Sequence, residues 1–117
     1  MEKQTELMGI IAENWGKYRD LVPEITPGYD QMSEAAYAGG KLDSKTKRLM
    51  AISVAVACRC KACMLYQTDH ALALGADAEE ILEACTVAVS LGGTMAAGET
   101  TRVVQYLDEL GVLPKRD

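Results

Sequence analysis

The feature that most constrains the fold is a regular series of helix start and stop signals along the chain. Pro23, Gly39-Gly40, Gly75 and Gly92-Gly93 interrupt stretches in which apolar residues recur at helical spacing. These interruptions predict six helices and no strand, with the helices at residues 2–19, 26–39, 43–57, 60–74, 77–91 and 94–110. We therefore expect an all-α fold with six helices.

At 117 residues, the chain suits a single domain over residues 1–117. It contains no Phe, five Tyr and one Trp, so its core must be built from Leu, Ile, Val, Ala and Met, which favours packed helices over a β-sandwich. The second half of the expected helix at 43–57 is apolar on every side, which indicates a central buried helix. A β-strand at residues 52–56 is the competing interpretation, and the alanine content argues for helix.

The charge and hydropathy of the chain argue against nucleic-acid and membrane partners. A formal net charge of −5 argues against non-specific binding of nucleic acid, and we interpret Lys45, Lys47 and Arg48 as a solvated helix start. The N-terminal residues show no targeting signal, and the longest strongly apolar run, residues 49–58, contains Ser53 and is far shorter than a membrane span, so we expect no membrane partner. Four cysteines without a secretory signal indicate a reducing, cytoplasmic compartment without structural disulfides.

Cys60 and Cys63 form a CxxC motif at the expected start of the fourth helix. Two cysteines at this spacing can form a disulfide within one turn, and the positive helix end stabilises a thiolate, the form that attacks disulfides and peroxides. Arg59 and Lys61 flank Cys60 and favour its thiolate further. The motif therefore predicts a redox site, without a bound cofactor, in which one sulfur attacks and the other resolves the adduct.

Two other interpretations of the cysteines stay open. All could be small buried apolar residues, and Cys58 and Cys85 are most simply core cysteines on helical faces. Alternatively, Cys58, Cys60 and Cys63 could bind a metal together with Cys85 or His70. The sequence has no second CxxC and no HxxxH motif, which argues against zinc and makes an iron–sulfur cluster the metal-based hypothesis.

Cys63, Gln67 and His70 share one face of the expected fourth helix, because they are spaced i, i+4 and i+7. His70 lies about 10 Å along the helix axis from Cys63, too far for a direct hydrogen bond. It could act through Gln67 or a water. The alternative is an ordinary surface histidine beside Asp69.

Three further features form a pattern that is more specific than the CxxC motif alone. They are residues 42–49 (LDSKTKRL), the apolar helix that leads to the CxxC motif, and residues 75–84 (GADAEEILEA). With the later Gly92-Gly93, they resemble the carboxymuconolactone decarboxylase family, and within it the alkylhydroperoxidase D-like branch. The resemblance covers about residues 42–110. It implies an all-helical fold that assembles as a homo-trimer or homo-hexamer, and a CxxC motif that reduces hydroperoxides.

The resemblance also implies roles for individual residues. It makes Cys63 the attacking thiol and Cys60 its exposed exchange partner. The positive end of the expected fourth helix, by contrast, makes Cys60 the more activated thiol. Where the family's proton relay has a Glu and a His, this chain has Arg48 and Gln67, neither of which can act as a general base near neutral pH. Arg48 could instead stabilise a thiolate if it folds back towards the dithiol, and His70 could replace the relay from one turn further along.

Our primary hypothesis is a CxxC-dependent enzyme that reduces a hydroperoxide or a disulfide and is recharged by a separate thiol or dithiol electron donor. The alternatives are an iron–sulfur module for electron transfer or disulfide reduction, and an oligomeric scaffold without catalysis. Lactone decarboxylation ranks low, because the decarboxylase members of the family lack this dithiol.

Overall fold

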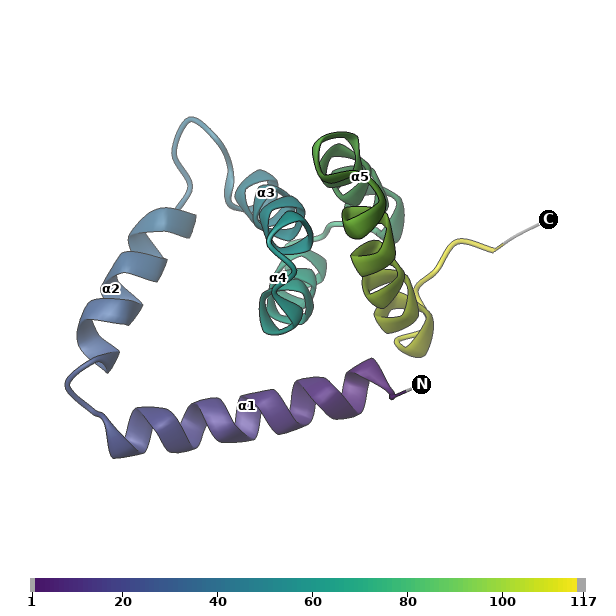
Figure 1. The fold of residues 1–117 in the computed structure, drawn as a ribbon. Coiled ribbons are helices and arrows are strands. Elements are labelled where there is room, and N and C mark those ends of the chain that lie inside the picture. Colours follow the sequence, from purple (N-terminus) through teal and green to yellow (C-terminus); the bar gives the residue numbers. More distant parts are fainter. Residues whose placement is uncertain (1, 116–117) are drawn as a thin grey trace.

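The computed structural model describes residues 2–115, which form five helices and no strand (Figure 1). These helices are α1 (Gln4–Leu21), α2 (Thr26–Tyr37), α3 (Ser44–Ala57), α4 (Lys61–Ala73) and α5 (Ala78–Glu109). The all-α prediction is confirmed, but the prediction of six helices is wrong. The last two expected helices form one element, α5, which is bent where the sequence predicted a break.

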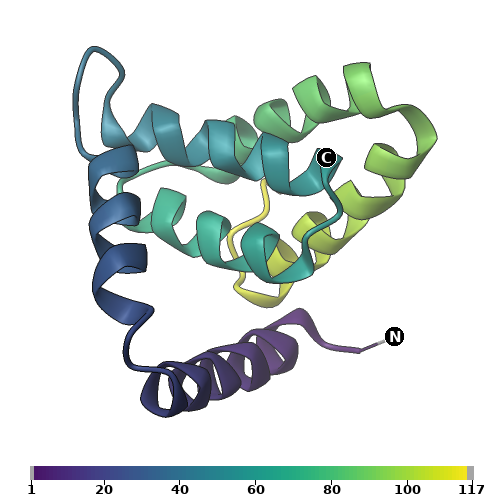
Figure 2. The same ribbon diagram turned by 60° about the vertical axis from the view of Figure 1, so that its left-hand side comes forward.

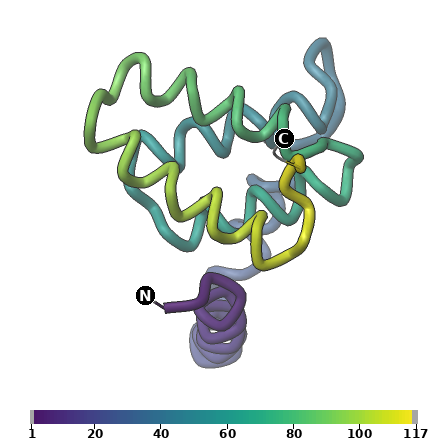
Figure 3. Tube along the Cα trace, turned by 90° about the vertical axis from the view of Figure 1, so that its right-hand side faces the viewer, coloured from purple at the N-terminus to yellow at the C-terminus, as the bar shows by residue number. Residues whose placement is uncertain are grey.

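The bend in α5 lies at Gly93, whose backbone is not helical (φ 66°, ψ −146°). Such a conformation is nearly restricted to glycine, because a side chain there would strain the backbone. Small residues also pack closely at this point, since a Cβ on Gly92 would lie 2.8 Å from Cβ of Ala96. At this bend the second part of α5 turns sharply back, as Figures 2 and 3 show.

The helix ends follow local hydrogen-bonding chemistry. The Asp43 carboxylate caps α3 by accepting from the backbone N–H of Thr46 at 2.7 Å. Asp77 and Glu80 form the predicted capping box at the start of α5. Gly75, with a φ of 94°, ends α4 in the left-handed conformation that favours glycine.

Helices α3, α4 and α5 enclose the hydrophobic core. Its largest apolar side chains are fully buried, namely Ile52, Val56, Met64, Leu65, Ile81, Val103 and Leu107. The prediction that the second half of α3 makes it a central buried helix is confirmed for the face that carries Ile52, Ala55 and Val56, but Val54 on the other face is 61% exposed and Met50 is 51% exposed. The core therefore uses one face of α3 and leaves an apolar face uncovered.

Helices α1 and α2 form an L-shaped N-terminal arm beside this core (Figure 1). The radius of gyration, 14.7 Å, exceeds the value of about 13 Å typical of a compact chain of this length, as expected for a projecting arm. One end of the arm is fixed by the Glu109 carboxylate, which accepts hydrogen bonds from the backbone N–H groups of Gln4 (2.9 Å) and Thr5 (2.8 Å). At the other end, Ser44 Oγ donates to the carbonyl oxygen of Tyr37 at 2.8 Å.

Helix α5 is the one described helix that is long and apolar enough to cross a membrane by length and composition. It is bent at Gly93, and apolar residues of both its arms, Ile81 and Val103 among them, are buried in the core. Core helices of water-soluble proteins meet the same criterion, so this finding is weak support for a membrane span. The absence of a membrane partner stays a prediction.

Candidate functional site

The dithiol lies in the turn between α3 and α4. Cys60 is the N-cap of α4, Cys63 is in the first helical turn, and the two sulfurs are bonded, with the Cα atoms 5.2 Å apart. The backbone N–H of Cys63 points at Cys60 Sγ at 3.2 Å, as a capping residue requires. Arg59, just before the pair, adopts a positive φ of 58°, which no other non-glycine residue does within residues 2–115. The CxxC motif is thus a tight corner stabilised by the helix end.

The two cysteine residues differ in exposure. Cys63 is exposed and Cys60 is half-buried, which is the reverse of the exposure that the resemblance implied for Cys60. Of the other two cysteines, Cys85 is buried as predicted, and burial raises the pKa of its thiol to about 11. Cys58 is exposed, so its interpretation as a core cysteine is wrong.

An iron–sulfur site on a single chain does not fit this arrangement. Within residues 2–115, no group of three His, Cys, Asp or Glu side chains lies close enough together to hold a metal ion. Cys85 is buried in α5 within the hydrophobic core, whereas Cys58 is exposed at the end of α3. The four cysteines therefore do not converge on one point, as a cluster requires.

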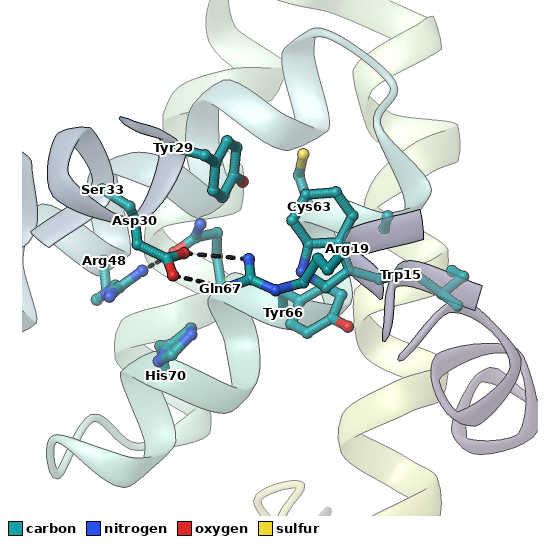
Figure 4. A pocket seen from close by; sticks show the side chains of 12 residues that line it. Trp15, Arg19, Tyr29, Asp30, Ser33, Arg48, Cys63, Tyr66, Gln67 and His70 are labelled. Carbon is teal, nitrogen blue, oxygen red and sulfur yellow. Dashed lines mark hydrogen bonds and ion pairs between the residues drawn. The ribbon is translucent and has the colours of Figure 1, made fainter. Parts of the chain in front are cut away.

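Cys63 opens onto a pocket of about 310 Å³ between the N-terminal arm and helices α3 and α4 (Figure 4). The pocket is lined by residues of α1, α2, α3 and α4, namely Ile11, Trp15, Arg19, Tyr29, Asp30, Ser33, Arg48, Ala62, Cys63, Tyr66, Gln67 and His70. Cys63, Gln67 and His70 all belong to this lining, which confirms that they share one face of α4. Cys60 does not line it.

One wall of the pocket is an ion pair between α1 and α2. The Arg19 guanidinium donates two hydrogen bonds to the Asp30 carboxylate, at 2.6 and 3.1 Å (Figure 4). These hydrogen bonds lower the pKa of Asp30. Arg19 also lies 5.3 Å from the ring of Trp15, and that ring meets Tyr29 edge-on at 5.2 Å. Charge and aromatic contact therefore hold the two helices of the arm, α1 and α2, against each other beside the pocket.

Arg48 enters the pocket from α3. Its Nη1 donates to Gln67 Oε1 at 2.9 Å, and its guanidinium lies 3.6 Å from the ring centre of Tyr37. Arg48 is thus half-buried, and its interpretation as part of a solvated helix start is wrong. Its neighbours satisfy their charges elsewhere: Lys45 pairs with Glu80 at 2.8 Å, and Lys47 donates to a backbone carbonyl.

His70 lies near Arg48 at one end of the pocket in Figure 4, and Trp15 lies at the other. Partial burial, reinforced by the charge of Arg48, lowers the pKa of His70, so the imidazole is neutral near pH 7. Asp69 opposes this shift only weakly, and its carboxylate accepts a hydrogen bond from the Tyr106 hydroxyl at 2.5 Å. The Cys63 sulfur points away from Arg48 and His70 in this view, so Arg48 does not fold back onto the dithiol.

The sequence did not identify the residues that the arm contributes. Trp15, Arg19, Tyr29 and Asp30 read as ordinary members of two amphipathic helices, and Tyr66 as a residue of α4. The one available signal was the gathering of the single Trp, a Tyr and an Arg/Asp pair on either side of Pro23. Nothing in that local pattern says that these side chains face the CxxC motif.

Comparison with known proteins identifies the family to which the chain belongs. The sequence model of the carboxymuconolactone decarboxylase family matches residues 23–106. A Paracoccus denitrificans protein named for its place in the cox locus is 33% identical over 86 residues, which cover 74% of this chain and 78% of that protein.

Two solved structures are also similar. A carboxymuconolactone decarboxylase family protein from Legionella pneumophila has a TM-score of 0.86 and 30% identity, covering 93% of this chain and 97% of the other. A family member from Thermotoga maritima, described with a suggested role in the antioxidative response, has a TM-score of 0.76 and 32% identity, covering 86% and 88%. From the sequence match, the shared helical fold and these identities, the chain belongs to the carboxymuconolactone decarboxylase family.

Proposed function

We propose that this chain is a thiol-based redox enzyme in which Cys60 and Cys63 alternate between dithiol and disulfide. The observation that carries the proposal is the position of the pair. The two sulfurs are bonded at the N-terminal end of α4, and Cys63 is exposed at a pocket with largely apolar walls. A small organic substrate in that pocket would lie beside the reactive sulfur.

In the oxidative half-reaction, the Cys63 thiolate attacks the terminal oxygen of a hydroperoxide. The O–O bond breaks, the alkoxide takes a proton and leaves as an alcohol, and Cys63 becomes a sulfenic acid. The Cys60 thiolate then attacks the sulfenic sulfur, so that an S–S bond forms and the displaced hydroxide takes a proton and leaves as water. One hydroperoxide is reduced to alcohol and water while two thiols are oxidised to one disulfide.

In the reductive half-reaction, a donor thiol attacks the exposed sulfur of Cys63, and Cys60 leaves as a thiolate. The Cys63 N–H and the positive end of α4 stabilise that leaving thiolate, which favours the exchange. A second donor thiol then attacks the donor sulfur of this mixed disulfide, the bond to Cys63 breaks and Cys63 leaves as a thiolate, so two donor thiols become one donor disulfide. The same steps in reverse reduce a substrate disulfide. Cys63 is thus the attacking sulfur, and Cys60 the stabilised thiolate.

The family relationship supports this proposal. The CxxC motif and its flanking segments fit the alkylhydroperoxidase D-like branch, and the Thermotoga maritima relative carries a suggested antioxidative role. We further propose a cytoplasmic location, where thiol and dithiol donors keep such a site reduced.

Proton transfer in the pocket falls to His70 in this proposal. The guanidinium of Arg48 stays protonated, and the amide of Gln67 does not titrate. The pKa of His70 is lowered, so its imidazole is in the proton-accepting form near neutral pH. Because the Cys63 sulfur points away from it, His70 would act through water. Thiol–disulfide exchange depends least on this relay, since it needs only the two cysteines.

The test compares peroxide turnover, with a dithiol donor, in four variants. Cys60→Ser, Cys63→Ser and the double variant should each abolish turnover, whereas the matched control Cys58→Ser, at an exposed cysteine outside the pair, should keep it. Cys60→Ser should also trap the donor as a mixed disulfide on Cys63, detected by mass spectrometry. Turnover that survives in both single variants would exclude the mechanism. Lactone turnover by the double variant would instead indicate a decarboxylase.

We also propose that the chain assembles as a homo-trimer or homo-hexamer. Large apolar side chains are exposed on more than one helix of the single chain, including Leu91 (90%), Leu21 (81%), Met32 (64%) and Val54 (61%). Uncovered apolar surface of this kind is typical of protein interfaces. Light scattering should give three or six times the chain mass, and a monomer at micromolar concentration would refute this assembly.

A further inference from the structure

We propose that the pocket beside Cys63 binds organic acids, with the carboxylate paired to Arg48 and an apolar body against the aromatic wall. The substrate of the redox site would then be a hydroperoxide or disulfide that carries a carboxylate. This second statement rests on the proposed function, whereas the binding of an organic acid does not.

The first observation is that Arg48, which stacks on the ring of Tyr37, has no carboxylate partner. Within residues 2–115, no carboxylate lies within 4 Å of its guanidinium, whereas Arg19 and Lys45 each pair with an acid. Its hydrogen bond goes to a neutral amide, Gln67, and its Nε atom is buried with no hydrogen-bond partner among the described residues. A partly desolvated cation that has no carboxylate partner attracts one, because charge-assisted hydrogen bonds are the strongest class.

The second observation is the charge of the rest of the pocket. Its one lining acid, Asp30, is held in two hydrogen bonds by Arg19, so these two charges cancel locally. His70 adds no charge near pH 7, because its pKa is lowered. The pocket therefore carries a net charge of about +1, located at Arg48, and favours an anion over a neutral or cationic ligand.

The third observation is the distribution of apolar surface. Trp15, Tyr29, Tyr66 and Ile11 line the pocket, and Trp15 lies at the end opposite Arg48 in Figure 4. A ligand whose carboxylate meets Arg48 would lay its apolar body towards these rings and towards Cys63. The volume of about 310 Å³ suits a small organic acid.

Arg48 also stands where the proton relay implied by the resemblance has a glutamate. A glutamate at position 48 would repel a carboxylate, whereas Arg48 attracts it. The amide oxygen of Gln67 accepts one hydrogen bond from Nη1 of Arg48, and Nη2 donates to none of the described residues. The exchange of charge at one position thus changes the class of ligand that the pocket accepts.

Binding can be measured without turnover, because Trp15 is the only tryptophan of the chain and lines the pocket. The full chain, with its dithiol reduced, is titrated with 4-phenylbutyrate and with its neutral amide, by tryptophan fluorescence and by calorimetry. We expect the acid to bind at least about tenfold more tightly than the amide. Equal affinities, or no binding of the acid by either method, would overturn the proposal.

The same titrations are run on Arg48→Met and on the matched control Lys47→Met, which removes an equal charge outside the pocket. We expect Arg48→Met to weaken acid binding by about tenfold without changing amide binding, and Lys47→Met to change neither. Arg48→Lys, which keeps the charge, should retain part of the preference and guards against misfolding of the methionine variant. Undiminished acid binding in Arg48→Met would overturn the proposal.

A turnover assay then separates this inference from the proposed function. A small aryl hydroperoxide that carries a carboxylate is compared as a substrate with its methyl ester. The acid should have the higher kcat/KM, and Arg48→Met should abolish the difference. If neither peroxide is reduced while 4-phenylbutyrate still binds through Arg48, the redox proposal fails and the acid site stands. If both are reduced equally, the redox proposal stands and the acid specificity fails.

Discussion

Replacing Gly93 by alanine should destabilise the fold without creating a steric clash. A Cβ at this position meets no atom within 4 Å, so the cost comes from the backbone alone. With φ at 66° and ψ at −146°, an L-residue other than glycine is strained by about 1–3 kcal/mol. The strained backbone is what turns the second arm of α5 back along the molecule.

Gly98 provides a matched control within the same helix. A Cβ there also meets nothing within 4 Å, and Gly98 has no positive φ. Glycine-to-alanine replacement at an unstrained site stabilises a protein by about 0.4–1 kcal/mol, largely by restricting the unfolded chain. Because this gain is common to both variants, the difference between Gly93→Ala and Gly98→Ala isolates the backbone strain, about 1–3 kcal/mol.

The assay is equilibrium unfolding in denaturant, followed by circular dichroism, at equal chain concentration for the two variants and the wild type. We expect Gly98→Ala to be slightly more stable than the wild type and Gly93→Ala to be the least stable of the three. Equal stability of the two alanine variants would refute the argument that the bend of α5 requires glycine.

Three further predictions concern the anchoring of the arm, the core and the buried thiol. Desolvation alone would raise the pKa of Glu109, but hydrogen bonds from Thr5 and Gln4 outweigh it and lower the pKa to about 2. The contribution of Glu109 to stability should therefore be present above about pH 4.3 and be lost as the pH falls towards 2. In Glu109→Gln, this part of the acid transition, followed by circular dichroism, should disappear. Leu65→Ala should cost about 2–5 kcal/mol in denaturant unfolding, since Leu65 is fully buried on α4; a loss below 1 kcal/mol would contradict that packing. Because the pKa of Cys85 is about 11, its thiol should stay unmodified by iodoacetamide at pH 8 in the folded chain, and rapid labelling seen by mass spectrometry would show that it is accessible.

The helix ends were predictable because they depend on neighbours in sequence. Asp43 accepts from a backbone group three residues away, and Asp77 and Glu80 satisfy each other's backbone within one turn. Gly75 supplies a positive φ where α4 ends. The position of the bend at Gly93 followed from the same local chemistry. The local sequence did not show whether residues 77–110 form one bent helix or two, because this depends on how the segments on either side of Gly93 pack.

The pocket depends on contacts between residues far apart in the chain. Glu109 anchors α1 through residues more than 100 positions away, and Arg48 reaches Gln67 across two helices. Such pairs leave no periodic pattern, so sequence reasoning identified the CxxC motif and its helix face but not the arm that covers it.

The most direct test of the redox proposal is the fate of the cysteines after a single exposure to peroxide. The fully reduced chain is mixed with an equimolar amount of an organic hydroperoxide, quenched by alkylation and analysed by peptide mass spectrometry. We predict that Cys60 and Cys63 are recovered as one intramolecular disulfide, with an equal amount of peroxide converted to alcohol, while Cys58 and Cys85 remain as thiols. Recovery of Cys60 and Cys63 as alkylated thiols, with the peroxide unconsumed, would contradict the proposed peroxidase chemistry.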